Sequence, residues 1–260
     1  RQRPLGGRRV VFDKAPADLD TEIADHVVKP RRVRQRGGDR CTPAFEANNG
    51  YAASGALRVG RVLGELDYWW FGEPVQHYHF RGTGEVAQKL SITVSAGEQT
   101  YTMGGLVELI EAGVRMIQPD IVKMGGITGL QRCAALAQAH GVELVSHQTQ
   151  PMVGHLANLH VCAAQMHATK PCEWNDPTAR THEVFDDPPM PVDGLFHLSD
   201  RPGLGIEFDD NALSKRRTDI TGQTQAALPL RLPPRGGAQK PNTFAANFRG
   251  GPAADTDTLS

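Results

Sequence analysis

The stretch Val94-Ser95-Ala96-Gly97-Glu98-Gln99 is the most informative part of this 260-residue sequence. It follows the β-branched pair Ile92-Thr93, and small residues after Val94 lead directly to a carboxylate. In a parallel barrel, a short buried strand delivers a polar side chain to its C-terminal mouth in this way. The stretch therefore predicts a strand over residues 92–98 with Glu98 at the mouth.

Similar strand ends recur on both sides of Glu98. Apolar runs end at Glu46 upstream and at Asp120, His147 and Glu173 downstream. The spacing between such positions is roughly 25 residues, which accommodates one strand, one helix and two short connections. Because barrel strands present their C-terminal ends to a shared cavity, we expect these side chains to line one central site.

The segments between these strand ends alternate between two kinds of pattern. We expect strands at 10–14, 41–45, 67–71, 92–98, 116–122, 142–145 and 171–174, and helices at 54–66, 84–90, 103–112, 129–140 and 151–167. Gly113 and Gly141 follow two of the helices, where glycine commonly ends a helix. Alternating units with short links predict an α/β protein with a parallel sheet. Their number favours an incomplete TIM-type (β/α)7β barrel, and the lack of a glycine-rich dinucleotide turn after the first strand disfavours a doubly wound sheet.

Two parts of the chain fit this pattern poorly. The helical pattern that Pro16 and Asp18 open should stop at Pro30, and residues 30–40 are rich in arginine, so we expect a poor barrel helix there. Residues 1–8 are predicted to be a disordered lead-in, 9–213 the barrel domain and 214–260 a disordered tail with almost no apolar pattern.

The composition excludes several classes of function. A net charge of −1 and the lack of an apolar run of about 18 residues disfavour nucleic-acid and membrane partners. The four cysteines show no CxxC spacing, so neither a zinc site nor a disulfide framework is indicated. Free thiols are typical of the cytoplasm, where we expect the protein to reside. The sequence leaves a homo-oligomer open.

The polar strand ends suggest a specific chemistry. Three acids from neighbouring strands could hold one hard cation, and Mg²⁺ prefers oxygen ligands. Asp120 beside His147 would raise the pKa of the imidazole and orient it as a general base. A metal facing a base suits removal of the proton α to a carboxylate, because the metal neutralises the enediolate that forms.

Five motifs in order resemble the enolase superfamily, in the C-terminal barrel of its mandelate racemase and muconate-lactonizing branch. They are Glu-Ala-Asn-Asn-Gly-Tyr (46–51), Phe-Gly-Glu-Pro (71–74), Ala-Gly-Glu-Gln (96–99), Gln-Pro-Asp-Ile-Val-Lys-Met-Gly-Gly-Ile-Thr (118–128) and Val-Ser-His (145–147). The resemblance covers roughly residues 9–213 and rests on the order and spacing of the motifs.

The resemblance implies a role for each polar strand end. Glu46, position 72 and Glu98 would bind Mg²⁺, and Asp120 with His147 would form the acid/base dyad. The other implied roles are Glu173 for stabilising the intermediate, Lys123 for holding the dyad, Lys14 for a second base, and a place near the metal for Asn48. Asn48 and Gln99 also belong to the polar mouth, where we expect them to contact the substrate.

The chain departs from the family pattern in three ways. Position 72 is Gly where the family carries its second metal carboxylate, Glu46 replaces the commoner Asp, and we expect the N-terminal capping domain and the first barrel strand to be missing. Glu73 is next to Gly72, but adjacent strand residues point to opposite faces, so Glu73 would reach the metal only through a bulge. We expect weak Mg²⁺ binding and a large loss of activity.

The expected function is that of a Mg²⁺-dependent lyase that removes the proton α to a carboxylate and dehydrates a sugar acid. A racemase or cycloisomerase uses the same chemistry and remains an alternative. An alternative of another class is a catalytically impaired fragment, which Gly72 and the missing cap favour.

Overall fold

The computed structural model describes residues 9–14, 23–38, 41–150, 152–165, 170–174 and 184–216. The chain divides into two compact units, Arg1–Arg216 and Arg217–Ser260. The predicted lead-in 1–8 and nearly all of the predicted tail lie outside the described residues. Among the residues described, no helix is long and apolar enough to cross a membrane.

In the described part of the chain, six parallel strands form the sheet, in the order in which they occur along the sequence. They are β1 (Arg9–Lys14), β2 (Cys41–Glu46), β3 (Trp70–Gly72), β4 (Thr93–Ala96), β5 (Met116–Ile117) and β6 (Glu143–Leu144). Each strand is followed by a helix, and sequential order with parallel pairing is the arrangement of a TIM-type barrel. The expected α/β fold, an incomplete barrel of this type, is confirmed.

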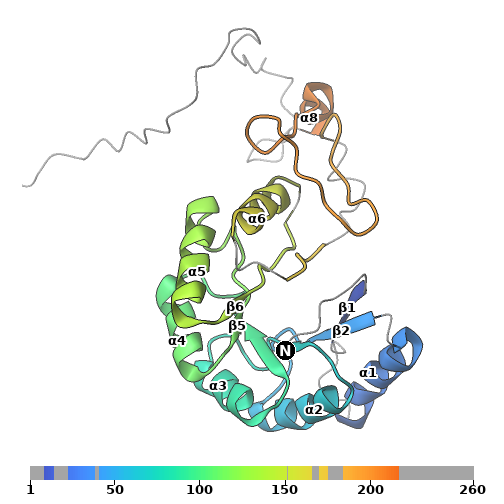
Figure 1. Ribbon diagram of the computed structural model, residues 1–260, viewed down its shortest axis with the longest axis vertical. Helices are drawn as coiled ribbons and strands as arrows, with labels where there is room; N and C mark the ends of the chain where they lie inside the picture. The colour runs from blue at the N-terminus through green and yellow to red at the C-terminus, as the bar shows by residue number, and fades with distance from the viewer. Residues whose placement is uncertain are drawn as a thin grey trace, which may run out of the picture. The chain divides into compact units, whose positions relative to one another are not determined.

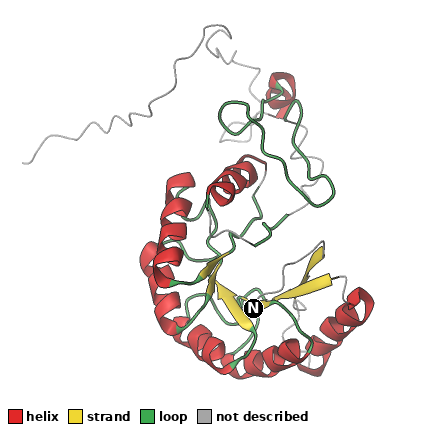
Figure 2. Ribbon diagram, viewed as in Figure 1, coloured by secondary structure: helices red, strands yellow, loops and turns green. Residues whose placement is uncertain are grey.

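The helices lie on the outer side of the strands (Figures 1 and 2). They are α1 (Ile23–Gly37), α2 (Ala53–Glu65), α3 (Phe80–Lys89), α4 (Met103–Ala112), α5 (Ile127–His140) and α6 (Met152–Ala164). A further short helix, α8 (Asp210–Arg216), follows the loop-rich segment after α6 and does not belong to this layer. Helices α4 and α5 end at Gly113 and Gly141 in the left-handed conformation, as the sequence predicts.

The sheet buries side chains on both of its faces. Phe71 packs outward with Phe45 and Leu63 in a cluster under α2 and α3, whereas its neighbour Trp70 packs with Met116 on the other face. Successive strand residues point to opposite faces of the sheet, so one short strand contributes side chains to the clusters on both faces. Both faces of the strands are packed with apolar side chains, and the buried acids Glu73, Glu98 and Asp120 lie just beyond the ends of strands.

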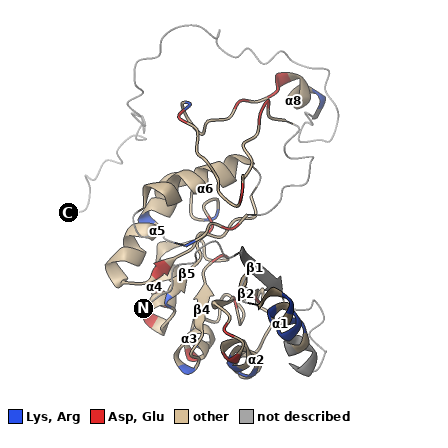
Figure 3. Ribbon diagram, turned by 45° about the vertical axis from the view of Figure 1, so that its right-hand side comes forward, with Lys and Arg blue, Asp and Glu red and all other residues tan. Residues whose placement is uncertain are grey.

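Helix α1 corrects the expectation for the segment around Pro30. The helix continues through Pro30 to Gly37, although an internal proline costs about 3 kcal/mol. Two tertiary contacts hold this part of the helix: the Tyr68 hydroxyl donates to the Pro30 carbonyl at 3.1 Å, and Arg34 pairs with Asp67 at 3.1 Å. Figure 3 shows basic residues along α1, so this arginine-rich segment is a helix packed beside α2.

The expected strand at 171–174 is wrong. The structure describes these residues without strand pairing. Cys172 packs instead in a cluster with Leu156 and Leu159 of α6 and with Leu198 and Ile206 of the segment that follows. The apolar residues in this stretch therefore serve a cluster beside α6.

His155 of α6 is a buried histidine within this region. Its ring packs edge-on against Trp174 and Phe196, with centroids at 4.8 and 5.6 Å. Its Nε2 has no hydrogen-bond partner among the described residues. Burial lowers the pKa of His155 to about 4, so the ring is neutral at pH 7.

Replacing His155 by Phe should remove part of the acid sensitivity of the fold. The unfolded chain takes up a proton near pH 6.5, whereas the folded chain does so only near pH 4, so stability falls as pH drops below 6.5. From these two pKa values we expect a loss of about 2 kcal/mol between pH 7 and pH 5 that His155→Phe lacks. Denaturant unfolding at both pH values measures it. His140→Phe, at an exposed position, should retain the wild-type difference; equal differences in all three proteins would contradict the assignment.

Candidate active site

The ends of the parallel strands bring the predicted residues to one edge of the sheet. Glu46 is in register with Lys14 of β1 and with Gly72 of β3. Beyond β5 and β6, Asp120 and His147 form an isolated parallel bridge. The regular register explains why residues separated by a full strand–helix unit become neighbours.

Asp120 and His147 make direct contact. Nδ1 of His147 lies 2.9 Å from Oδ2 of Asp120. Asp120 is fully buried, and its other oxygen accepts the Val122 and Lys123 N–H groups at 2.8 and 3.1 Å. Gln150 donates to Oδ2 at 3.0 Å. The carboxylate is thus held at both oxygens and fixes the orientation of the imidazole.

Hydrogen bonds determine the ionisation of Asp120. Burial by itself would raise its pKa, but the bonds from His147, the Lys123 N–H and Gln150 outweigh burial and lower the pKa to about 2. A carboxylate can only accept hydrogen bonds, so Nδ1 of His147 carries the proton. The lone pair of a neutral His147 is then on Nε2.

Nε2 of His147 faces a second carboxylate. It lies 3.3 Å from Oε2 of Glu98. Burial tends to lower the pKa of His147, but the bond to Asp120 and the charges of Glu98 and Glu173 raise it above its ordinary value. The imidazole is therefore more basic than an ordinary histidine side chain, which favours a role as a general base.

Glu98 is presented by a tight turn after β4. Gly97 has φ 123°, a backbone conformation that favours glycine. Lys123 Nζ donates to the Glu98 carbonyl at 2.8 Å and to Oε1 of Gln99 at 3.1 Å, and Gln99 donates to Oε1 of Glu98 at 3.2 Å. Lys123 and Gln99 thus hold the Glu98 turn, and Lys123 reaches the dyad only through its backbone N–H.

Glu73 is turned inward by the backbone at the end of β3. Its φ of 39° is in the left-handed region, so its side chain does not follow the alternation of the strand. Oε1 accepts the Gly97 N–H at 2.7 Å and the Glu98 N–H at 3.1 Å. Burial raises the pKa of Glu73 to about 7, although the Gly97 N–H partly opposes the shift. One oxygen of the predicted ligand is therefore occupied by the Glu98 turn.

Two substitutions of Glu73 should distinguish the contribution of its hydrogen bonds to stability from the contribution of its negative charge. Glu73→Ala leaves two buried N–H groups without an acceptor, and we expect a loss of about 2–4 kcal/mol in the free energy of unfolding. Glu73→Gln keeps an acceptor oxygen and should lose less than about 1 kcal/mol. Denaturant unfolding of the metal-free variants measures both. Equal losses for the two variants would contradict the role of Oε1 as the acceptor in this turn.

Glu46 lies among other acids. Its Oε1 accepts the Asn48 N–H at 2.7 Å. Burial raises the pKa of Glu46 well above its ordinary value, and the charges of Glu98, Glu73 and Glu173 raise it further. Asn48 itself has φ 48°, and its side chain is exposed. The mutual repulsion of these carboxylates would be relieved by a cation.

The donor set fits a hard cation in its chemistry. Within the described ranges, no three His, Cys, Asp or Glu side chains converge into a group that could hold a metal. Mg²⁺, however, is usually bound by one or two carboxylates together with water and substrate oxygens. Glu46 and Glu98 are two carboxylates at this edge of the sheet, and the charge of Glu98 raises the pKa of Glu46, so they are the residues that would hold the ion.

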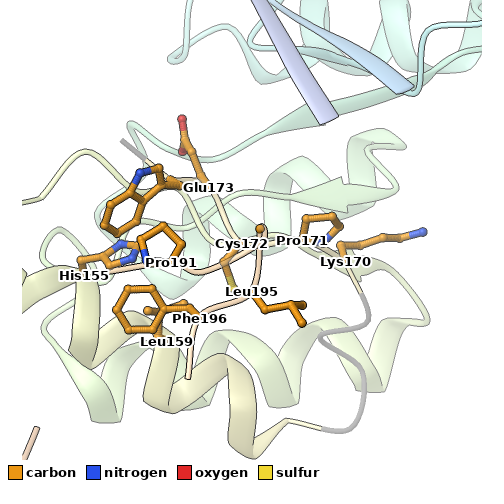
Figure 4. A pocket seen from close by; sticks show the side chains of 11 residues that line it. His155, Leu159, Lys170, Pro171, Cys172, Glu173, Pro191, Leu195 and Phe196 are labelled. Atoms are coloured by element: carbon orange, nitrogen blue, oxygen red, sulfur yellow. The ribbon is translucent and has the colours of Figure 1, made fainter. Parts of the chain in front are cut away.

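Glu173 connects this site to a neighbouring cavity. Its Oε2 accepts the Gln148 N–H at 2.7 Å, next to His147. A cavity of about 470 Å³ lies beside it. Figure 4 shows the Glu173 carboxylate directed away from Leu159 and Phe196 on the apolar wall of this cavity. Glu173 thus lies between the polar strand ends and a cavity beside α6 that is lined mainly by apolar side chains.

Sequence reasoning predicted most of these residues but missed Gln150 and the contact between Gly72 and Glu46. The side chain of Lys14 is outside what the structure describes, and only its backbone register beside Glu46 is known. Gln150, which binds Asp120, was missed because a glutamine after a strand end carries no distinctive signal. The close fit of Gly72 to Glu46 was missed because it depends on side-chain placement across two strands.

Known proteins of several activities are similar to this chain. It is 27% identical to arabinonate dehydratase of Saccharolobus solfataricus over 200 residues, 74% of this chain and 52% of the relative. It is 31% identical to D-galactarolactone cycloisomerase of Agrobacterium fabrum over 194 residues, 71% of this chain and 51% of the relative. The chain thus spans about half the length of these curated relatives.

Solved structures and a family model agree with the fold. A mandelate racemase/muconate lactonizing protein from Paracoccus denitrificans is 54% identical, with a TM-score of 0.77 over 82% of this chain and 59% of that one. A structure from the same organism, complexed with magnesium, is 55% identical with a TM-score of 0.74, over 82% of this chain and 58% of that one. The enolase C-terminal domain-like family model matches residues 7–212. The parallel strands, the polar residues at their ends and this match together place the chain in the enolase C-terminal domain-like family.

Proposed function

We propose that this chain carries the active site of a Mg²⁺-dependent enzyme that removes the proton α to the carboxylate of a sugar acid. The observation that supports this best is the orientation of His147. Its Nδ1 is held by fully buried Asp120, and its Nε2 faces the Glu98 carboxylate. A histidine that is held at one ring nitrogen and has the other available can act as the general base of this reaction.

Each residue then has a defined task. His147 takes the α-proton at Nε2, and Asp120 keeps the imidazole in the required tautomer and orientation. Glu46 and Glu98 would hold Mg²⁺, which supplies positive charge beside the substrate carboxylate. Glu73, Lys123 and Gln99 hold the turn that presents Glu98.

The remaining predicted residues fall at the edges of the site. Glu173 follows His147 in the chain, whereas Glu98 precedes it. The charge of Glu173 raises the pKa of both His147 and Glu46. We assign it to stabilisation of the intermediate. Lys14 is the second base of the proposal, and the exposed side chain of Asn48 is available to the substrate.

Dehydration is the reaction that we favour. Loss of the α-proton and of the hydroxyl on the next carbon removes one water molecule and leaves an enol, which becomes a 2-keto-3-deoxy acid. Arabinonate dehydratase is one of the similar proteins. Cycloisomerisation is the second candidate, because the 31% identical relative is a D-galactarolactone cycloisomerase.

Deuterium exchange tests the proposal directly. The chain is incubated with Mg²⁺ and a panel of sugar acids in D₂O, and loss of the α-proton signal is followed by NMR. Formation of a 2-keto acid is followed by its semicarbazone. We expect exchange or product with at least one sugar acid. A folded protein, verified by circular dichroism, that gives neither signal with any member would contradict the proposal and favour the impaired-fragment alternative.

A further inference from the structure

Glu46 at the end of β2 and Gly72 at the end of β3 are neighbours. The long side chain of Glu46 lies where Gly72 has none. They are in register at the ends of the two strands. A Cβ atom on Gly72 would collide with Oε2 of Glu46, and it would lie 2.9 Å from Cδ and 3.4 Å from Oε1 of the same residue. The three nearest atoms all belong to one carboxyl group. The Glu46 carboxylate therefore fills the space that a side chain at position 72 would occupy.

The Glu46 carboxylate has little freedom to move out of this space. The end of a flexible side chain usually yields to a new methyl group at small cost. Here Oε1 is bonded to the Asn48 N–H at 2.7 Å. Other acids, Glu98 and Glu73, are near enough to repel it. A methyl group on residue 72 would therefore shift the carboxylate away from the Asn48 amide.

We propose that Gly72 is a positioning residue for Glu46: its missing side chain allows the Glu46 carboxylate to lie across the end of β3. The two positions together then provide one carboxylate to the site. The placement itself needs no metal, whereas its consequence for cation binding rests on the proposed function. It follows that Gly72→Glu adds no ligand, because it puts a second carboxylate into occupied space.

A double-mutant cycle isolates this relationship. The proteins are the wild type, Gly72→Ala, Glu46→Asp and the double variant. Gly72 is not among the positive-φ glycines, so alanine suits its backbone. Aspartate is one methylene shorter and withdraws the carboxylate from Gly72, yet aspartate can still accept the N–H two residues further on. The substitution at 72 should therefore matter only when residue 46 is glutamate.

The first measurement uses metal-free protein. Hydrogen exchange of the Asn48 amide, followed by NMR, reports on its bond to Glu46. Gly72→Ala should speed this exchange about tenfold in the wild-type background, and less than about threefold in the Glu46→Asp background. Gly104→Ala is the matched control, since a Cβ at Gly104 meets nothing within 4 Å. It should leave the exchange of Asn48 unchanged.

The second measurement is Mg²⁺ affinity by calorimetry. Gly72→Ala should weaken binding about tenfold when residue 46 is glutamate, and less than about twofold when it is aspartate. Gly72→Glu should bind more weakly than the wild type. The double variant with Glu46→Asp and Gly72→Glu should bind Mg²⁺ more tightly than Gly72→Glu alone. In the double variant the shorter aspartate at position 46 leaves room for the glutamate at position 72.

Different results would contradict the proposed function and the proposed role of Gly72. If wild-type protein does not bind Mg²⁺, the proposed function is wrong, and exchange of the Asn48 amide still decides the role of Gly72. If Gly72→Ala changes that exchange equally in both backgrounds, or in neither, Gly72 does not position Glu46. Tighter Mg²⁺ binding by Gly72→Glu alone would also overturn the proposal.

Discussion

His147→Asn is expected to lower the rate of α-proton exchange by about 10³-fold, because a positioned general base contributes about 10²- to 10⁴-fold to a reaction. Asparagine can still donate a hydrogen bond toward Asp120, which keeps the fold, but it has no basic nitrogen to take the proton. The measurement is the rate of deuterium incorporation into whichever sugar acid the wild type accepts.

The matched control for this substitution is His140→Asn. His140 is exposed at the end of α5 and contacts none of the strand-end acids among its described interactions. It should exchange the substrate at the wild-type rate. Unchanged exchange in His147→Asn, with Mg²⁺ present, would remove His147 from the role of base and direct attention to Lys14.

Glu98→Gln is expected to weaken Mg²⁺ binding by about 100-fold or more. A unit charge at about 4 Å contributes about 4 kcal/mol at an effective dielectric constant of 20, and replacement of a carboxylate by water recovers only part of it. The same change removes a charge that raises the pKa of Glu46. The metal-free variant should therefore be no less stable than the wild type. Calorimetry with Mg²⁺ and denaturant unfolding measure the two effects.

Glu108→Gln is the control for this second prediction. Glu108 is an exposed glutamate on α4, so its replacement changes the net charge equally without touching the site. Its Mg²⁺ affinity should match that of the wild type. Wild-type affinity in Glu98→Gln would remove Glu98 from the ligand set, and a marked loss of stability would show that its role is structural.

Much of the sheet could be predicted because each strand carries a local signal. The apolar runs that end at Glu46, Glu98, Asp120 and His147 correspond to β2, β4, β5 and β6 or to the residues just after them. The helix ends at Gly113 and Gly141 were also predictable, since a left-handed residue at a helix end strongly favours glycine.

The errors arose where tertiary contacts overcame local preference. Pro30 should end a helix, but α1 continues, with the Tyr68 hydroxyl bonded to the Pro30 carbonyl and Arg34 of α1 bonded to the Cys41 carbonyl. The apolar residues near Cys172 suggested a strand, but they pack against α6. In both places the local pattern is weak compared with the burial available from a neighbouring element.

The sequence by itself determined the order of the elements, the parallel sheet and the set of acids and histidine that meet at one edge, since these depend on periodicity and on register at strand ends. Only the tertiary structure decided how those side chains divide the space. Glu73 holds the Glu98 turn, and Glu46 occupies the room left by Gly72. The reason is physical: a strand pattern specifies the face of each residue, whereas the reach of a carboxylate depends on neighbours that are distant in the chain.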